Sequence, residues 1–238
     1  MALVSYTDDI LAAVDRWDGV LRRPSEESRQ RPEGVQVLKS SVLERIFATS
    51  YWFMPAVWFG PIIGYGLYRS VADPTLSPGW TVTLFVVGVL FWTLTEYVLH
   101  RGLFHLRPGG WWRPSKLRLF MIHGYHHEYP NDRMRLVAPP IMSWPIGAVI
   151  LGGFILVAGP HLCWGLIAGT ATGYLAYDWI HFYTHHAKPR TRVGRFLQRY
   201  HLEHHYKDQD SHFGISSPLW DLAFRTFRAQ DAAARRSP

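Results

Sequence analysis

Long apolar runs alternate with polar, charged segments along this chain. Four runs are nearly free of charge, at about residues 46–68, 80–99, 141–158 and 162–183. An α-helix rises about 1.5 Å per residue, so about 20 residues cross a hydrocarbon layer of about 30 Å. Four such runs within 238 residues are too many for the buried core of a soluble protein, and they predict four membrane-spanning helices.

The basic residues predict how these helices are oriented, because cytoplasmic segments of membrane proteins collect Lys and Arg. Residues 1–45 hold seven of the 25 Lys and Arg, residues 100–140 hold seven and residues 187–238 hold ten, whereas Arg69 alone follows the first run. This distribution predicts two helical hairpins, with both termini and the middle segment in the cytoplasm. It also explains the net charge of +7 without a nucleic-acid partner.

Two regions are expected. Residues 1–45 form a polar, partly helical cytoplasmic segment, and residues 46–238 form the membrane domain with a C-terminal cytoplasmic cap. Within the first region, an amphipathic helix is predicted over residues 7–22, followed by a charged linker at 24–34. The apolar side of that helix carries Ile10, Leu11, Val14 and Leu21.

Histidine is the residue type that points to chemistry. Eleven of the thirteen histidines fall in four clusters, each at or beyond the predicted cytoplasmic end of an apolar run: His100 and His105; His123, His126 and His127; His181, His185 and His186; His201, His204 and His205. Residues three and four apart share a helix face, so the second and fourth clusters can each converge on one side. The five-residue spacing of His100 and His105 does not stack on a regular helix and predicts a helix end or a distortion.

These histidines predict a metal site, since neutral imidazole is the commonest protein metal ligand. Ten or eleven imidazoles are too many for one ion, and at about four or five per metal they fit two ions in one site. Zinc binds nitrogen sites more tightly than iron, but it does no redox chemistry. Activation of O₂ would therefore require iron or, less commonly, copper.

The clusters resemble the HX4H, HX2HH, HX3HH and HX2HH boxes of the fatty acid hydroxylase superfamily, which also includes sterol desaturases and carotenoid hydroxylases. Flanking strings narrow the resemblance to the fatty acid 2-hydroxylases of sphingolipid metabolism. These strings are Glu96-Tyr-Val-Leu before His100, Arg135-Leu-Val-Ala-Pro-Pro140, Tyr177-Asp178 before His181, Phe213-Gly-Ile-Ser and Trp220-Asp221. The likeness covers about residues 80–227, and the first 45 residues carry no comparable signal.

The resemblance implies an all-α integral membrane protein, with about four transmembrane helices in two hairpins and a cytoplasmic helical cap that holds a dinuclear metal site. It makes His186 a neighbour rather than a ligand, and it makes Asp178 and Glu203 candidates to orient imidazoles through their second N–H. The implied metal ligands are His100, His105, His123, His126, His127, His181, His185, His201, His204 and His205.

The implied activity is that of a membrane di-iron monooxygenase, which hydroxylates a long acyl chain of a free fatty acid or a ceramide at carbon 2. Its cofactors would be two iron ions and O₂, with zinc able to occupy the site in purified protein. Many relatives carry a cytochrome b5 domain with a His-Pro-Gly-Gly string, whereas the nearest string here is Arg107-Pro-Gly-Gly110. The resemblance therefore implies a separate electron donor of the ferredoxin or cytochrome type.

Two alternatives stay open. The same chemistry could act on a sterol, a carotenoid or an ether lipid, or the chain could be a non-catalytic membrane metal-binding or transport protein. Against transport, the apolar runs contain no series of polar residues to line a path across the bilayer. The expected location is a multi-pass membrane position, in the bacterial inner membrane or the endoplasmic reticulum according to source, with the metal site cytoplasmic.

Overall fold

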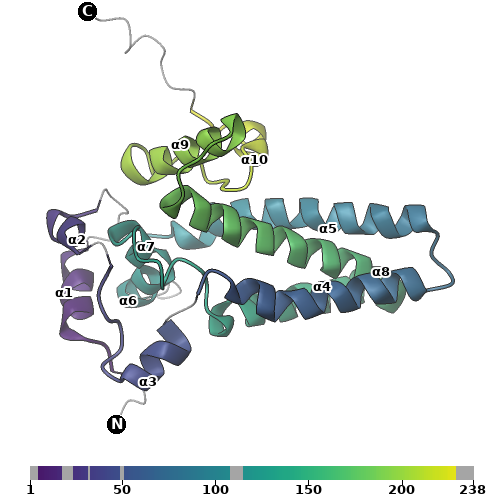
Figure 1. Cartoon of the computed structure of the whole chain (residues 1–238), viewed down its shortest axis with the longest axis horizontal. Coiled ribbons are helices and arrows are strands. Elements are labelled where there is room, and N and C mark those ends of the chain that lie inside the picture. The colour runs from purple at the N-terminus through teal and green to yellow at the C-terminus, as the bar shows by residue number, and fades with distance from the viewer. Residues whose placement is uncertain (1–4, 18–23, 32, 49–50, 108–114, 229–238) are drawn as a thin grey trace, which may run out of the picture.

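The computed structural model describes residues 5–17, 24–31, 33–48, 51–107 and 115–228. Figure 1 shows long helices lying side by side, with shorter helices gathered around one end of them. Within the described residues, the regular structure is helical apart from one isolated bridge between Tyr6 and Leu38. The fold class is therefore all-helical, as the sequence predicts.

Three of the described helices, α4, α5 and α8, are long; the shorter ones are called the cap helices. The bounds are α1 (Asp8–Arg16), α2 (Glu26–Gln30), α3 (Ser41–Leu43), α4 (Met54–Ala72), α5 (Pro78–Leu99), α6 (Lys116–Leu119), α7 (Tyr125–Glu128), α8 (Pro140–His186), α9 (Arg192–Tyr206) and α10 (Leu219–Ala223). Three π-helical turns adjoin them: η1 (Glu44–Ala48), η2 (His100–Phe104) and η3 (Phe120–Gly124). The helices α4, α5 and α8 each begin with a proline in the first turn, where the missing N–H has no partner to lose.

In the part of the chain that the structure describes, two helical stretches are long and apolar enough to cross a membrane, Pro78–Phe104 and Pro140–His186. The second is broken at Gly159, whose φ of 77° lies in the left-handed region that glycine tolerates. Ile150, before the break, packs against the cluster that contains Ala171, after the break. A straight helix would hold these two residues about 32 Å apart, so α8 is a hairpin whose two arms meet at Gly159.

Glycines allow α5 and the second arm of α8 to pack backbone against backbone. A Cβ atom on Gly169 would lie 2.0 Å from the Phe85 carbonyl oxygen, and one on Gly88 would lie 2.2 Å from the Leu166 carbonyl oxygen. Thr170 uses the close approach, because its hydroxyl donates to the Gly88 carbonyl at 3.1 Å. Small residues that let helices approach in this way are typical of membrane helix interfaces.

The first long helix begins later in the chain than predicted. Helix α4 begins at Met54 rather than near residue 46, since Pro55 favours a first-turn position and residues 51–53 form a turn. The expectation that Arg69 follows the first helix is wrong. Arg69 lies in the last turn of α4, where its guanidinium donates to the Tyr65 hydroxyl at 3.0 Å and lies 5.1 Å from the Trp164 ring centroid.

The N-terminal region packs against residues 117–129. Helix α1 starts after the predicted Thr7, whose side chain accepts from the Ile10 N–H, and it ends at Arg16. Ile10 and Val14 are buried as expected, but Leu11 is exposed, because it lies on the other face of the helix. Leu21 lies outside the described residues. The predicted linker contains α2, and the buried residues of this region form one cluster with Phe120, Tyr125 and Tyr129.

Candidate metal centre

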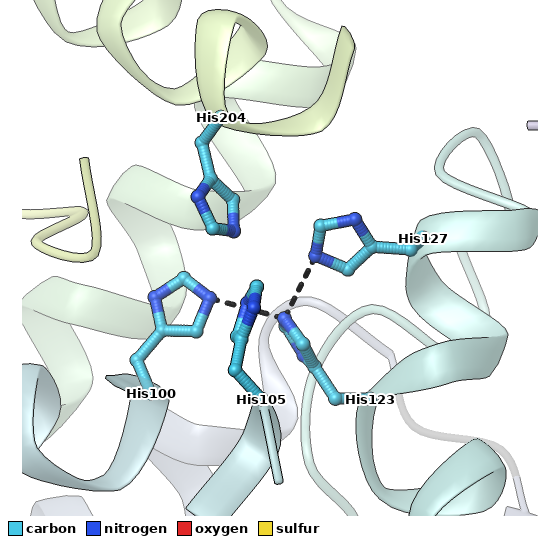
Figure 2. A group of neighbouring side chains, drawn as sticks. All are labelled: His100, His105, His123, His127 and His204. Atoms are coloured by element: carbon cyan, nitrogen blue, oxygen red, sulfur yellow. Dashed lines mark hydrogen bonds between the residues drawn. The ribbon is translucent and has the colours of Figure 1, made fainter. Parts of the chain in front are cut away.

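The ten histidines expected as ligands lie in two groups of five near the cap end of the long helices. Within each group the candidate ligand nitrogens lie within 4.8 Å of one another. The first group is His100, His105, His123, His127 and His204, and the second is His126, His181, His185, His201 and His205. Figure 2 shows the rings of the first group directed toward a common centre from separate parts of the chain.

Two of the histidine clusters are divided between the groups. His126 belongs to the second group and its neighbour His127 to the first, and His204 and His205 are divided in the same way. Adjacent residues on an α-helix are about 100° apart around the axis, so each pair faces two centres. The expectation that the second and fourth clusters each converge on one side is therefore wrong. The division also brings the groups together, with the ring centroids of His127 and His205 4.2 Å apart.

The distortion expected between His100 and His105 is the π-helical turn η2. The His105 N–H donates to the His100 carbonyl at 3.2 Å, five residues back instead of four. This wider turn brings the two ring centroids within 5.0 Å of each other. Single π-turns inside α-helices often occur at functional sites, and η2 allows a five-residue spacing to serve one centre.

The Nε2 atoms of the second group cannot satisfy one another by hydrogen bonds. The His126 Nε2 lies 3.0 Å from the Nε2 atoms of both His181 and His205. The His201 Nε2 lies 2.8 Å from that of His185 and 3.1 Å from that of His205. In neutral imidazole one ring nitrogen donates and the other accepts. Nε2 atoms that each contact two others therefore cannot all be matched as donor with acceptor, and lone pairs are left facing one another. A cation among them would accept all these lone pairs at once.

The first group shows the same deficit. The His123 Nε2 lies 3.0 Å from the Nε2 atoms of both His100 and His127. The Nε2 atoms of His105 and His204 are buried without a hydrogen-bond partner. Buried polar atoms are nearly always paired in folded proteins, so these orphaned nitrogens indicate a missing partner. The donor set of both groups therefore fits two metal ions.

Backbone carbonyls orient two histidines of the first group. The Nδ1–H of His100 donates to the Phe213 carbonyl at 2.5 Å, and the Nδ1–H of His204 donates to the Ser211 carbonyl at 2.7 Å. Because a carbonyl only accepts, the proton must lie on Nδ1, and the Nε2 lone pair is left to face the centre. Partners of this kind fix the tautomer and the ring orientation of metal-bound histidines.

Burial keeps the imidazoles of the cap neutral. Loss of solvation, with repulsion from neighbouring imidazoles, lowers the pKa of these groups well below its usual value, because the charged form is penalised. The residues concerned are His123, His126, His127, His201, His204 and His205. A neutral ring keeps a lone pair for a metal ion, so the environment selects the form that binds metal.

Two buried carboxylates hold the loop that carries these carbonyls. Asp221 accepts from the N–H groups of Phe213 and Gly214 at 2.9 and 2.7 Å, and it also accepts from the Tyr200 hydroxyl. Glu96, one turn before His100, accepts from the Ser216 N–H at 2.8 Å. Sequence reasoning flagged the strings that contain Glu96 and Asp221 but missed their role. The only available signal was an acidic residue in each string.

The other candidates take different positions. Asp178 is buried, and within the described chain no hydrogen bond joins it to an imidazole. Glu203 pairs with Arg199 at 3.9 Å and Lys207 at 3.7 Å. His186 lies in neither group, and its ring centroid is 4.6 Å from that of Phe182. Backbone carbonyls, rather than these carboxylates, therefore supply the orienting bonds seen in this structure.

The N-terminal region is tied to the second histidine cluster through Tyr125. The Tyr125 hydroxyl donates to Asp132 at 2.6 Å and accepts from the Val35 N–H at 3.1 Å. Arg135 forms ion pairs with Asp132 and with Glu44. Since Tyr125 stands between His123 and His126, this network fixes the backbone that presents both groups.

This fold and site define a class: an all-helical protein with long apolar helices and two histidine groups suited to a dinuclear metal site. The Fatty acid hydroxylase family model matches residues 85–226, which include all ten histidines. The chain belongs to the fatty acid hydroxylase family.

Individual relatives agree with this assignment. The chain is 36% identical over 234 residues to the dihydroceramide fatty acyl 2-hydroxylase FAH1 of Arabidopsis thaliana, with 95% of each chain covered. It is 33% identical to the fatty acid 2-hydroxylase of Mus musculus, covering 83% of this chain and 58% of the mouse protein. The solved structure of full-length scs7p, in which only the hydroxylase domain is visible, matches with a TM-score of 0.76 and 32% identity, covering 93% of this chain and 84% of that one.

Proposed function

We propose that this protein uses O₂ to hydroxylate a long acyl chain at carbon 2, on a free fatty acid or a ceramide. The observation that carries the proposal is the pair of histidine groups with buried, converging Nε2 atoms, in a chain similar to a dihydroceramide fatty acyl 2-hydroxylase. Two iron ions, when bound, would supply the insertion of one oxygen atom into a C–H bond, while two electrons and two protons reduce the other oxygen to water.

The chain's own contribution is binding, orientation and exclusion of water. Each group of five histidines would hold one iron ion through Nε2 atoms. The Phe213 and Ser211 carbonyls would keep the rings of His100 and His204 turned toward the first ion. Burial of His201, His204 and His205 keeps bulk water away from the centre.

The proposed setting is a membrane, with four spans formed by α4, α5 and the two arms of α8. Apolar side chains on the outer surface of the first arm, such as Val149, Leu156 and Val157, are exposed in the isolated chain. Lipid would cover them, whereas a soluble protein rarely leaves so large an apolar surface open. Residues 1–45 would form a cytoplasmic segment docked on the cap of the domain at 46–238, with both termini and the metal site in the cytoplasm.

Electrons would come from a separate ferredoxin or cytochrome-type protein. Helix α9 turns His201 and His205 toward the metal centre and leaves Arg192, Arg195 and Arg199 exposed on its outer side. This basic face lies directly behind the ligands and would attract an acidic donor, since complementary charge speeds encounter between partners.

The test is lipid mass spectrometry in a host that makes no 2-hydroxy acids, with the chain expressed together with a suitable electron donor. We expect acyl chains heavier by one oxygen atom at carbon 2, and no such product from His204→Ala. The matched control is His161→Ala, because His161 lies at the far end of the helices and pairs with Asp73 at 2.8 Å. Unmodified acyl chains from iron-loaded protein would refute the proposal. Detection of an oxygenated sterol, carotenoid or ether lipid instead would show that this lipid, and not an acyl chain, is the substrate.

A further inference from the structure

We propose that α10 and the adjoining Phe224 lie in the bilayer, in the leaflet next to the metal centre, and seat the ligand-orienting loop against the lipid. The inference rests on the proposed membrane setting and goes beyond it, because α10 is a short helix outside all four proposed spans. The proposed partner is the hydrocarbon and headgroup region of the membrane itself.

The polarity of α10 is reversed relative to that of a helix on a water-facing surface. Leu219, Leu222 and Phe224 are 46%, 59% and 49% exposed, whereas Asp221 is fully buried at 0%. A surface helix in water buries its apolar residues and exposes its acid. An outward apolar face with an inward carboxylate is the arrangement expected when the surroundings are lipid.

The position of α10 along α5 agrees with this. The indole N–H of Trp220 donates to the Thr93 hydroxyl at 3.0 Å. Thr93 lies seven residues before His100, about 10 Å deeper along the helix axis. The Phe224 ring stacks on that of Tyr97 at 5.2 Å. Helix α10 therefore lies beside the last turns of an apolar helix of membrane-spanning length and not beyond its end. In Figure 1, α10 lies near the cap end of α5.

The surroundings of α10 continue the pattern. Leu90, one turn from Thr93, is exposed, so the apolar surface of α5 runs on into that of α10. Arg225 follows α10 and is exposed, and the Arg101 guanidinium donates to the Tyr97 hydroxyl at 2.9 Å. An apolar face bordered by aromatic and basic residues is typical of segments that lie in the membrane interface.

Hydrogen bonds link α10 to the candidate metal centre. Asp221 of α10 accepts from the Phe213 N–H, and the Phe213 carbonyl accepts from the Nδ1–H of His100. The lipid-facing side of α10 and a candidate metal ligand are thus joined through two residues. Embedding α10 would hold this chain of hydrogen bonds at a fixed depth in the membrane.

The test uses spin labels on the full chain in phosphatidylcholine vesicles, with Cys163→Ala removing the single native cysteine. Labels at Leu219→Cys and Leu222→Cys report on α10. Val149→Cys marks the proposed span, and Arg195→Cys marks the proposed cytoplasmic face. Collisions with O₂ report lipid surroundings, and collisions with a water-soluble nickel chelate report aqueous surroundings. All four positions are exposed in the chain, so the labels should not disturb the core.

We expect both α10 labels to resemble Val149→Cys, with frequent O₂ collisions and few nickel collisions, while Arg195→Cys shows the reverse. Nickel access at α10 equal to that at residue 195, with residue 149 still protected, would overturn the inference and leave the membrane setting intact. Nickel access at residue 149 as well would overturn the membrane setting, and the position of α10 with it.

Discussion

Replacement of Asp221 tests whether the loop at 211–216 positions one metal group. The carboxylate accepts from Phe213, Gly214 and Thr226 at 2.7 to 2.9 Å and from the Tyr200 hydroxyl. Asp221→Asn keeps one acceptor oxygen and turns an amide donor toward other donors, so about two of these bonds are lost. Hydrogen bonds to charged groups contribute about 1.5–3 kcal/mol each, so the loss of unfolding free energy should be about 3 kcal/mol or more.

The larger expected effect is selective loss of one metal ion. The Phe213 and Ser211 carbonyls orient His100 and His204, which both belong to the first group. Loss of a bond that orients a metal ligand typically lowers metal affinity or activity about 10- to 100-fold. We therefore expect iron content to fall from about two ions per chain toward about one, with turnover largely lost.

The assay is elemental analysis of purified protein, alongside thermal unfolding and product formation. Asp210→Asn is the matched control, because Asp210 is an exposed acid just before the same loop. Full iron content and turnover in Asp221→Asn would refute the positioning role. Equal loss of both ions at unchanged iron supply would refute the selectivity and would point to general unfolding.

Three other perturbations distinguish the roles of particular residues. His126→Ala should lose iron and product formation, whereas His186→Ala should retain both, because only His126 lies in a histidine group; elemental analysis and mass spectrometry decide, and equal effects would contradict the ligand set. Removal of metal by a chelator should lower the thermal midpoint, with zinc restoring the midpoint alone and iron restoring turnover too; turnover with zinc would contradict a redox centre. Gly169→Ala should destabilise the protein by about 1–3 kcal/mol or more, the usual cost of overpacking, because its Cβ would lie 2.0 Å from the Phe85 carbonyl oxygen. Gly153→Ala is the control, since a Cβ there has no neighbour within 4 Å; equal thermal midpoints would contradict the close packing of α5 and α8.

The sequence predicted the elements whose signal is local. The break in α8 falls at Gly159, between two predicted apolar runs, because glycine and the following proline interrupt a helix wherever they fall. The distortion at His100 and His105 was likewise predictable from spacing, since five residues do not complete whole turns of an α-helix. The family resemblance also named the ten histidines that the structure brings together in two groups, although neither resemblance nor spacing shows which of them face one another.

Features that depend on tertiary contacts could not be predicted. The 100° between His126 and His127 sets two directions, but which distant histidines lie along each direction depends on how α7, α8 and α9 are placed, and no local pattern encodes that placement. The orienting bond to His100 comes from a backbone carbonyl at Phe213, which every residue possesses, so residue type carries no signal for it. Leu11 was misplaced for a related reason, because the face of α1 that is buried depends on the cap helices it meets.

The composition of the two groups explains why the cap and the long helices form one unit. The first group combines His100 from the end of α5 with His204 from α9, and the second combines His181 from α8 with His205 from α9. Neither group can form until α9 docks on the long helices, so metal affinity includes the free energy of that docking. A transport protein would need the opposite arrangement, because an ion that must leave requires ligands that separate easily. Histidines drawn from separate elements and buried together favour retention of the metals and catalysis at their position.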